Sequence, residues 1–400
     1  MNSKKRIIIT AGGTAGHIYP AIGIIEYIQE FYKDVEILYL GTKTGMENRL
    51  ISRMGIDFRV LRASGFAATN SYFKKAVIYM KFFFNLSVGF FGALMAIIRF
   101  KPDFIIGMGG YVCAPVFLAA LFWRKSIAIH EQNYIPGRLN KVFAKYARYV
   151  FLSFEESAAF FKQKKDKIAG RFIFTGNPVR KKIRDFKLAE PDYEKWHLKT
   201  GRFTVTAFGG SLGAEKINDS VVGLYEYFRD ECRMQIVLIC GIRFFAHLKD
   251  KLDLLFKPSD RLIFKIFEYV DQMEQIYRIT DLVISRAGAT TVAELAAVNI
   301  PAILIPYPLA IENHQYYNAQ FLSKNNRAIL IEDKDLNSGI LFSNISSLLE
   351  NERKKYIEIK SSGLSIKDIN SNGAKIISEK ILGIKTTGRT ISDKSRQPIR

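Results

Sequence analysis

A strand, a glycine turn, a helix and a second strand follow one another directly in residues 281–305. The apolar run Asp281–Ser285 predicts a buried parallel strand, and Arg286–Thr290 contains the glycine turn. A helix is expected to open at Thr290 and to end at Pro301, and Ala302–Ile305 predicts a second buried strand. A glycine turn before a helix start forms an anion site at the carboxyl edge of a parallel sheet. This segment therefore predicts an α/β fold with a phosphate-type site.

Thr291 and Glu294 in the same segment have the spacing of a capping box. In a capping box the hydroxyl and the carboxylate bond to free amides at the helix start. Glu294 therefore has two interpretations, as a cap in an ordinary βαβ unit or as a carboxylate that binds a ligand.

Three other predicted strands are also followed by glycine-rich loops. GGTAGH at residues 12–17 follows Arg6–Thr10, GMGGY at 107–111 follows Phe104–Gly107, and GGSLGA at 209–214 follows Phe203–Phe208. Such loops let backbone amides approach a phosphate closely. The first loop departs from the fingerprint G-x-G-x-x-G, which disfavours a nicotinamide site. We expect phosphate-bearing ligands at these loops.

The length of 400 residues exceeds what one hydrophobic core usually serves, so two domains are expected. The sequence Gly176-Asn-Pro178 breaks regular structure and predicts a hinge between them. Tyr149–Leu152 is expected to close the first sheet. The remaining strands are expected at Val35–Leu40, Phe58–Leu61, Ser126–Ile129, Gln235–Cys240, Leu262–Phe267 and Ala328–Ile331.

The net charge of +21 indicates an anionic partner, which could be nucleic acid, a membrane surface or a phosphorylated substrate. The chain has no basic-aromatic RNA-binding signature, so nucleic acid is the least favoured of these. Three cysteines without metal or redox spacing are typical of a reducing cytoplasm. The apolar run Ile7–Ile9 is too short for a signal peptide.

Residues 58–102 contain seven basic residues, many aromatic residues and no Asp or Glu. The uncharged stretch Phe82–Ile98 would reach roughly 26 Å as a helix, just short of a bilayer core. Three interpretations remain open: a membrane-spanning helix, a plain buried helix, and an interfacial helix on an anionic leaflet. The cationic flanks favour the interfacial helix.

Several motifs together resemble the MurG family of lipid-linked glycosyltransferases. They are GGTAGHxxP at residues 12–20, GxGGY at 107–111, HEQN at 130–133 with a later Asn-Lys, and SRAGATTVAEL with PxxLIP and NHQYYNAQ at 285–320. Ala15 stands where the family usually has glycine, so a positive φ would be costly there. The resemblance covers about residues 5–383 and implies the GT-B arrangement, two Rossmann-like domains facing a cleft.

The resemblance also implies roles for individual residues. Glu294 would bind the ribose hydroxyls of UDP, Gln315 and Asn133 would contact the sugar, and the backbone at Val270 would read the uracil. The donor site as a whole would comprise Thr14, Ala15, Gly16, Asn133, Arg180, Ser211, Val270, Ala289, Thr290, Thr291, Val292, Ala293, Glu294 and Gln315. The acceptor pyrophosphate would lie on Gly12, Gly13, Gly109, Gly110 and Tyr111. Loop amides, Ser211 and a guanidinium would stabilise the leaving diphosphate without a metal, and no cofactor is expected.

Four residues keep two interpretations. His17 is either a hydrogen-bonding residue of its loop or the general base on the acceptor, and Glu131 is the next candidate for the base. His130 and Glu131 either take part in catalysis directly or form a polar pair that orders the loop after a strand, and the polar pair is favoured. Arg180 either contacts the donor diphosphate or is a surface arginine beside Lys181.

The implied activity is inverting transfer of N-acetylglucosamine from UDP-N-acetylglucosamine to undecaprenyl-pyrophosphoryl-N-acetylmuramoyl-pentapeptide in peptidoglycan synthesis. Such an enzyme would be peripheral, on the cytoplasmic face of the cell membrane. The expected parts are an acceptor domain at 1–175, a donor domain at 176–365, a returning helix at 366–384 and a disordered basic tail at 385–400. Another GT-B enzyme is the alternative, either a diacylglycerol glycosyltransferase or a UDP-N-acetylglucosamine epimerase.

Overall fold

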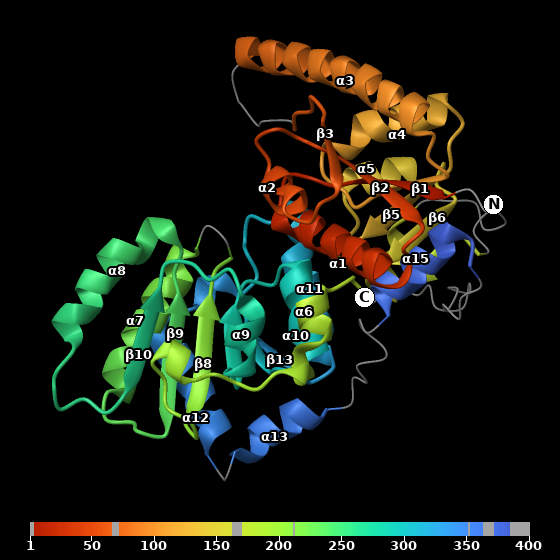
Figure 1. The fold of residues 1–400 in the computed structure, drawn as a ribbon. Helices are drawn as coiled ribbons and strands as arrows, with labels where there is room; N and C mark the ends of the chain where they lie inside the picture. The colour runs from red at the N-terminus through yellow and green to blue at the C-terminus, as the bar shows by residue number, and fades with distance from the viewer. Residues whose placement is uncertain are drawn as a thin grey trace. The chain divides into compact units, whose positions relative to one another are not determined.

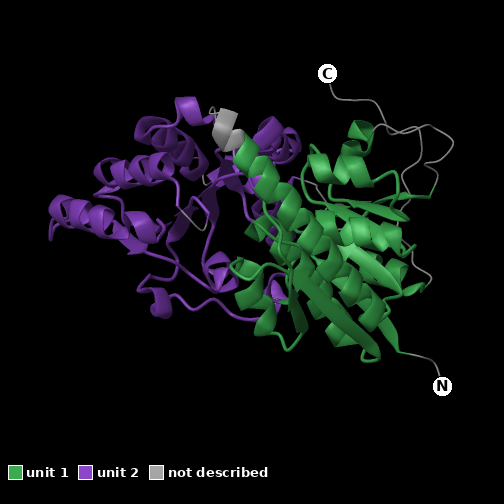
Figure 2. Cartoon of the chain, turned by 90° about the horizontal axis from the view of Figure 1, so that it is seen from above, with its two compact units in different colours: residues 1–181, 367–400 green, residues 182–366 purple. Residues whose placement is uncertain are grey.

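The computed structural model describes residues 4–65, 72–161, 170–210, 213–350, 353–362 and 372–384, without the side chains of 72–75 and 187. The chain forms two compact units (Figure 2). Unit 1 comprises residues 1–181 and 367–400, and unit 2 comprises residues 182–366. The expected basic tail lies outside the described residues.

Unit 1 is built on a seven-stranded parallel sheet in the order β3-β2-β1-β4-β5-β6-β7. Isoleucine-rich strands such as β1 are buried on both faces, as expected for a parallel sheet covered by helices. The prediction that β6 closes this sheet is wrong, because β7 pairs with β6 and adds one more strand. The strands are β1 Lys5–Thr10, β2 Val35–Gly41, β3 Asp57–Val60, β4 Phe104–Gly107, β5 Ile127–Glu131, β6 Tyr149–Leu152 and β7 Phe172–Phe174.

Helices cover both faces of this sheet (Figure 1). The last helix, α15, packs against α1 and so returns the chain to unit 1. Ile377 and Ile381 of α15 join the core cluster of α1 and β1. The helices are α1 Ala15–Phe31, α2 Met46–Ser52, α3 Tyr72–Phe100, α4 Cys113–Phe122, α5 Arg138–Phe143, the 3₁₀ helix η1 Glu155–Phe160, and α15 Gly373–Leu382.

Unit 2 repeats the same architecture with a six-stranded parallel sheet in the order β10-β9-β8-β11-β12-β13. Its strands are β8 Phe203–Phe208, β9 Met234–Ile239, β10 Ile263–Phe267, β11 Leu282–Ser285, β12 Ala302–Leu304 and β13 Ala328–Leu330. Its α-helices are α7 Glu215–Phe228, α8 Ile242–Leu255, α9 Met273–Arg278, α10 Ala289–Val298, α11 His314–Lys324, α12 Ser338–Leu349 and α13 Lys354–Ser361, and α6 Lys181–Arg184 starts at the unit boundary. Its short 3₁₀ helices are η3 Phe186–Leu188, η4 Glu194–Trp196, η5 Ile311–Asn313 and η6 Asp333–Asp335.

Strand order reverses once in each sheet, between β1 and β4 in unit 1 and between β8 and β11 in unit 2. In open α/β sheets, ligands bind beyond the carboxyl ends of the strands at such a reversal. Each reversal carries two of the predicted turns, because glycine loops follow β1 and β4, and also β8 and β11. The topology therefore brings the four predicted loops together in two pairs.

Helix α3 has one buried face and one exposed face. Ala93, Ala96 and Ile97 pack into the core beside α4, whereas Phe83, Phe84 and Phe91 are 60%, 58% and 66% exposed. The interpretation as a plain buried helix is therefore wrong. The helix is also longer than the uncharged stretch, because Lys81 and Arg99 lie within it.

At 29 residues, α3 would reach about 44 Å, so the prediction that it is too short to cross a membrane is wrong as well. Within the described residues, Ala76–Phe100 is long and apolar enough to span a bilayer by length and composition. Only 22% of its most apolar stretch is buried in the protein. Length therefore does not decide between a spanning and an interfacial helix.

Candidate active site

The two glycine loops of unit 1 pack backbone against backbone. Gly110 has a φ of +84°, and a Cβ there would collide with the carbonyl oxygen of Gly12. Gly13 has a φ of +92° and faces the Tyr111 ring, with 3.3 Å between a Cβ built on Gly13 and Tyr111 Cε1. Glycine is required at these positions by both backbone conformation and space. The acceptor residues of the sequence analysis thus lie in one continuous surface of unit 1.

Helix α1 starts at Ala15, immediately after the first loop, with Thr14 as its N-cap residue. Ala15 is not among the residues with positive φ, so alanine carries no backbone penalty there. The expected cost of losing the family's glycine is therefore absent. Thr14, Ala15 and Gly16 present the positive end of the α1 dipole in unit 1.

His17 lies in the first turn of α1 and contacts the second glycine loop. A Cβ on Gly109 would be 2.9 Å from both Nδ1 and Cε1 of the His17 ring. His17 Nδ1 is 2.9 Å from Gln132 Oε1, although the two residues are 115 positions apart in sequence. His17 is thus held by both neighbouring loops rather than by its own loop alone.

His130 is fully buried at the end of β5. Its Nδ1 is 2.9 Å from Gln132 Nε2, and its Nε2 is 3.2 Å from the carbonyl oxygen of Gly176. Burial lowers the pKa of His130 to about 4, while the bond to Gly176 opposes this shift and the neighbouring His17 adds to it. His130 is therefore a neutral structural residue at pH 7.

Glu131 is 1% exposed and orders the loop that follows β5. Its Oε1 accepts from the Asn133 backbone amide at 2.9 Å and from Asn133 Nδ2 at 3.3 Å. Its Oε2 accepts from Gly137 N at 2.9 Å and from Asn140 Nδ2 at 2.7 Å. These bonds occupy both oxygens, so Glu131 as the reserve general base is wrong, and its interpretation as a loop-ordering residue holds.

Two buried residues support the glycine loops and were missed in the sequence. Cys113 Sγ lies 3.3 Å from the Thr10 carbonyl and 3.1 Å from the Gly109 carbonyl, and burial raises the pKa of the thiol to about 12. The neutral thiol therefore links the starts of both loops. Glu47 Oε1 accepts from Thr42 N at 3.0 Å and lies against Gly12.

Arg180 also belongs to unit 1, where its guanidinium lies 4.3 Å from the centre of the Tyr19 ring. This cation–π stacking fixes the side chain along α1. Arg180 is therefore more ordered than a solvated surface arginine. Its implied role at the donor diphosphate remains a prediction.

The first loop of unit 2 follows β8 at Gly209 and Gly210, before α7. Gly210 has a φ of +94°, and its carbonyl accepts from Gly213 N at 3.0 Å to close the turn. A Cβ on Gly209 would collide with the returning chain at Ala214. Ser211, the hydroxyl proposed for the diphosphate, lies outside the described residues.

The second loop of unit 2 leads into α10, which starts at Ala289 with Gly288 as its N-cap. No side chain caps this helix, so the predicted capping box of Thr291 and Glu294 is wrong. Glu294 is instead 5% exposed in the second turn, and its Oε2 accepts from Tyr277 Oη at 3.2 Å. The carboxylate is held by Tyr277 of another helix and does not cap α10, and its role in ligand binding remains a prediction. No sequence pattern points to Tyr277, because α9 meets α10 only in the folded unit.

The other predicted donor residues of unit 2 surround these loops. Gln315 Oε1 accepts from Tyr307 N at 3.0 Å, which fixes the amide and leaves Nε2 as a donor. Val270 is buried in the loop between β10 and α9. The remaining predicted residues form the first turns of α10: Ala289, Thr290, Thr291, Val292 and Ala293.

Asp333-Lys-Asp335 is an Asp-x-Asp sequence, a pattern that often holds a metal in glycosyltransferases. The expectation of a metal-free site therefore cannot rest on the lack of such a sequence, and that part of its argument is wrong. Asp333 Oδ1 forms an ion pair with Arg286 Nη1 at 2.5 Å, and Arg286 also donates to the carbonyls of Ile305 and Pro306. Asp333 therefore anchors the loop after β11. No cluster of three or more His, Cys, Asp or Glu side chains suited to a metal occurs in the part of the chain that the structure describes.

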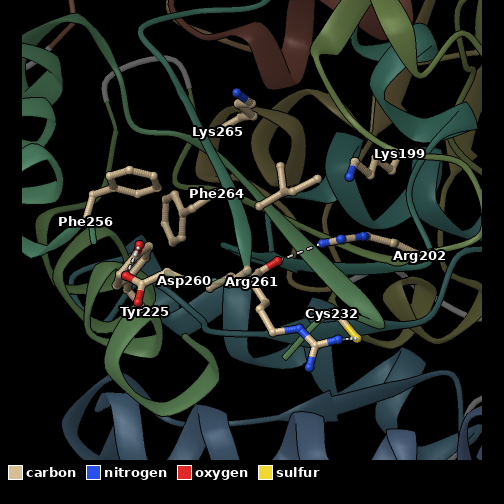
Figure 3. Close-up of a pocket in the computed structure, with 11 residues that line it drawn as sticks. Lys199, Arg202, Tyr225, Cys232, Phe256, Asp260, Arg261, Phe264 and Lys265 are labelled. Atoms are coloured by element: carbon tan, nitrogen blue, oxygen red, sulfur yellow. Dashed lines mark hydrogen bonds between the residues drawn. The ribbon is translucent and has the colours of Figure 1, made fainter. Parts of the chain in front are cut away.

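A cavity of about 440 Å³ lies elsewhere in unit 2 (Figure 3). Its lining residues include Arg202, Cys232 and Ile263, which precede or begin β8, β9 and β10. It therefore opens at the amino-terminal edge of the sheet, whereas the glycine turns follow the carboxyl ends. Arg202 donates to the Arg261 carbonyl at 2.9 Å, and Arg261 donates to Cys232 Sγ at 3.1 Å. We do not assign the donor site to this cavity.

Comparison with known proteins identifies the family. The N-terminal domain model of glycosyltransferase family 28 matches residues 7–152, and the C-terminal domain model matches 204–377. The UDP-N-acetylglucosamine–N-acetylmuramyl-(pentapeptide) pyrophosphoryl-undecaprenol N-acetylglucosamine transferase of Halothermothrix orenii is 38% identical over 351 residues, which cover 87% of this chain and 91% of that protein. The chain belongs to the MurG family. The Bacillus licheniformis enzyme of the same name is 34% identical and covers 91% of this chain and 95% of its own.

Solved structures agree on the fold. MurG from Acinetobacter baumannii superposes with a TM-score of 0.71 at 24% identity, covering 95% of this chain and all of that one. A UDP-GlcNAc 2-epimerase from Neisseria meningitidis gives a TM-score of 0.64 at 13% identity, covering 94% of this chain and all of that one. The expected α/β fold of GT-B class with two Rossmann-like domains is confirmed, and so is the glycosyltransferase class of this MurG-family chain.

Proposed function

We propose that this protein transfers N-acetylglucosamine from UDP-N-acetylglucosamine to an undecaprenyl-pyrophosphoryl-N-acetylmuramoyl-pentapeptide. The observation that carries the proposal is the match to transferases of this name over 87% of the chain, at 38% identity. The pair of glycine loops at each sheet reversal supports it, because donor and acceptor each bring a diphosphate. Unit 2 would take the donor and unit 1 the acceptor.

The donor half of the proposal rests on the loops after β8 and β11. Amides of the Gly209–Gly210 turn and the start of α7 supply hydrogen bonds to the diphosphate as negative charge grows on the leaving UDP. Glu294 accepts from the ribose hydroxyls, and Tyr277 holds its carboxylate in place. The Nε2 group of Gln315 donates to the sugar.

The acceptor half rests on the loops after β1 and β4. The pyrophosphate lies on the amides of Gly12, Gly13, Gly109 and Gly110, beside Tyr111. His17 takes the proton from the attacking sugar hydroxyl, a role worth typically 10²–10⁴-fold in rate. Direct attack with departure of UDP from the opposite face inverts the anomeric centre.

The exposed face of α3 supports attachment to a membrane surface on the side of the lipid acceptor. Phe83, Phe84 and Phe91 expose large apolar rings, and the end of α4 extends this surface with Phe122 and Trp123, which are 66% and 46% exposed. The rings of Phe90 and Phe122 pack edge to face with their centres 5.8 Å apart, so α3 and α4 form one surface. Residues 58–102 contain seven basic residues and no Asp or Glu, which favours binding to an anionic leaflet. We therefore propose a peripheral location on the cytoplasmic face, with the inner face of α3 packed on its own unit.

An acceptor panel tests this function against its alternatives. Purified protein is supplied with labelled UDP-N-acetylglucosamine and either the lipid-pyrophosphoryl muramoyl-pentapeptide, diacylglycerol or no acceptor. Label in the lipid-pyrophosphoryl product alone is expected. Transfer to diacylglycerol, or conversion of the donor to its 2-epimer without acceptor, would replace the proposal with the corresponding alternative. His17→Ala should lower turnover about a hundredfold or more and leave UDP affinity unchanged.

A further inference from the structure

We propose that Gln132 is a positioning residue that fixes the tautomer of His17, so that Nδ1 carries the proton and Nε2 is the free base. The observation is a continuous series of side-chain contacts through unit 1, from the Gly176 carbonyl through His130 and Gln132 to His17. The importance of this tautomer for catalysis rests on the proposed function, but the tautomer itself follows from the contacts alone.

The carbonyl groups around Gln132 fix the direction of its side-chain amide. One end of the amide lies 2.7 Å from the Met108 carbonyl oxygen and 3.2 Å from the His130 carbonyl oxygen. Carbonyl oxygens only accept hydrogen bonds, so this end must be the NH₂ group. The other end, Oε1, therefore faces His17, and Gln132 is only 1% exposed, so water does not compete for either end.

The orientation of Gln132 then fixes the proton on His17. Oε1 of an amide accepts and cannot donate, and it lies 2.9 Å from His17 Nδ1. Nδ1 must therefore donate and carry the proton. In a neutral imidazole the other nitrogen, Nε2, then has the free lone pair that a general base requires.

The same reasoning gives His130 the opposite tautomer. Its Nδ1 faces the NH₂ group of Gln132 at 2.9 Å and must accept, so its proton is on Nε2. That nitrogen lies 3.2 Å from the Gly176 carbonyl, which only accepts. Every donor in the series thus meets an acceptor, and all its hydrogen bonds are donated in the same direction, from His17 toward Gly176.

Gly109 fixes the position of the His17 ring, and Gln132 fixes which nitrogen of that ring carries the proton. A Cβ at residue 109 would lie 2.9 Å from Nδ1 of His17, so the ring packs on a bare Cα and cannot shift toward that loop. Gln132 holds the Met108 carbonyl of the same loop. One amide therefore links the second glycine loop, the buried His130 and the candidate base.

The test is ¹⁵N NMR of protein labelled at its five histidines, because protonated and bare ring nitrogens have widely separated shifts. The His17 signal is assigned from its loss in His17→Ala. We expect Nδ1–H with a bare Nε2 for His17 in the wild type, and Nε2–H for His130. Gln132→Met should give His17 a mixture of tautomers. A wild-type His17 with its proton on Nε2 would overturn the proposal, whatever activity the protein has.

Kinetics with a matched control separates positioning from loss of stability. Gln235→Met removes a buried glutamine of unit 2 that also bonds on both sides, to Lys199 and Thr204. Gln132→Met should lower kcat about tenfold or more with an unchanged UDP affinity, whereas Gln235→Met should keep both kcat and the His17 tautomer. Equal losses of kcat in the two variants, or full kcat with a mixed tautomer, would contradict a positioning role for Gln132.

Discussion

Replacing Gly110 by alanine should destabilise unit 1 by about 2–5 kcal/mol. The residue has a φ of +84°, which costs an L-residue about 1–2 kcal/mol. The new methyl group would also collide with the carbonyl oxygen of Gly12, and overpacking of this kind costs about 1–3 kcal/mol. The second contribution exists only because the two glycine loops touch.

Gly170→Ala is the matched control in the same unit. Gly170 has a φ of +81°, and a Cβ there meets no atom of the described residues within 4 Å. It should therefore cost only the backbone contribution, about 1–2 kcal/mol. The difference between the two variants isolates the contact between the loops.

Urea unfolding followed by tryptophan fluorescence measures this difference for unit 1 alone. The chain has two tryptophans, Trp123 in unit 1 and Trp196 in unit 2, so a Trp196→Phe background reports unit 1 specifically. This matters because two domains need not unfold in one step. Gly110→Ala should also abolish transfer while UDP binding persists. Equal destabilisation by Gly110→Ala and Gly170→Ala would refute the packing of the two loops.

Three further predictions follow from single features. Glu294→Ala should weaken UDP binding by about 1.5–3 kcal/mol in isothermal titration, and an unchanged Kd would remove Glu294 from the site. Folding lowers the pKa of His130 from its ordinary 6.5 to about 4, so the unfolded chain binds the proton first as pH drops. The free energy of unfolding should therefore decrease by up to about 3 kcal/mol from pH 6.5 to pH 4. In urea titrations, His130→Gln should make this pH dependence weaker. Changing Lys74, Lys75 and Lys81 together to Glu should release the protein from anionic vesicles in flotation, whereas the apolar face should keep part of the wild type bound at high salt. Failure of the wild type to float would make the exposed face of α3 an ordinary surface. Resistance of the wild type to extraction by both salt and carbonate would indicate a spanning helix.

Features that depend on local sequence were predictable. The four glycine turns each follow an apolar strand and precede a helix, so their pairing at two sheet reversals follows from the alternation of strands and helices. The cap at α10 was not predictable in this way. Gly288 takes the N-cap position, and Glu294 turns to Tyr277 on α9, because tertiary packing outweighs a local capping pattern.

Long-range contacts account for the other differences. Gln132 meets His17 across 115 residues only when β1, β4 and β5 lie side by side, and the periodicity of each segment gives no sign of this. The uncharged run Phe82–Ile98 predicts a shorter helix than the observed α3, because solvent accommodates the charges of Lys81 and Arg99 at exposed positions within the helix. Asp333 lies in an Asp-x-Asp sequence, yet its partner is the guanidinium of Arg286.

The anomeric configuration of the sugar in the lipid product is the most direct test of base-assisted transfer from UDP-N-acetylglucosamine. The donor carries an α-linked sugar, and single displacement with His17 as base must give a β linkage. We predict one N-acetylglucosamine added to the muramoyl residue, with the large anomeric coupling of a β linkage in the ¹H NMR spectrum and with product absent in His17→Ala. An α-linked product, or release of free sugar without an acceptor-linked product, would contradict the account.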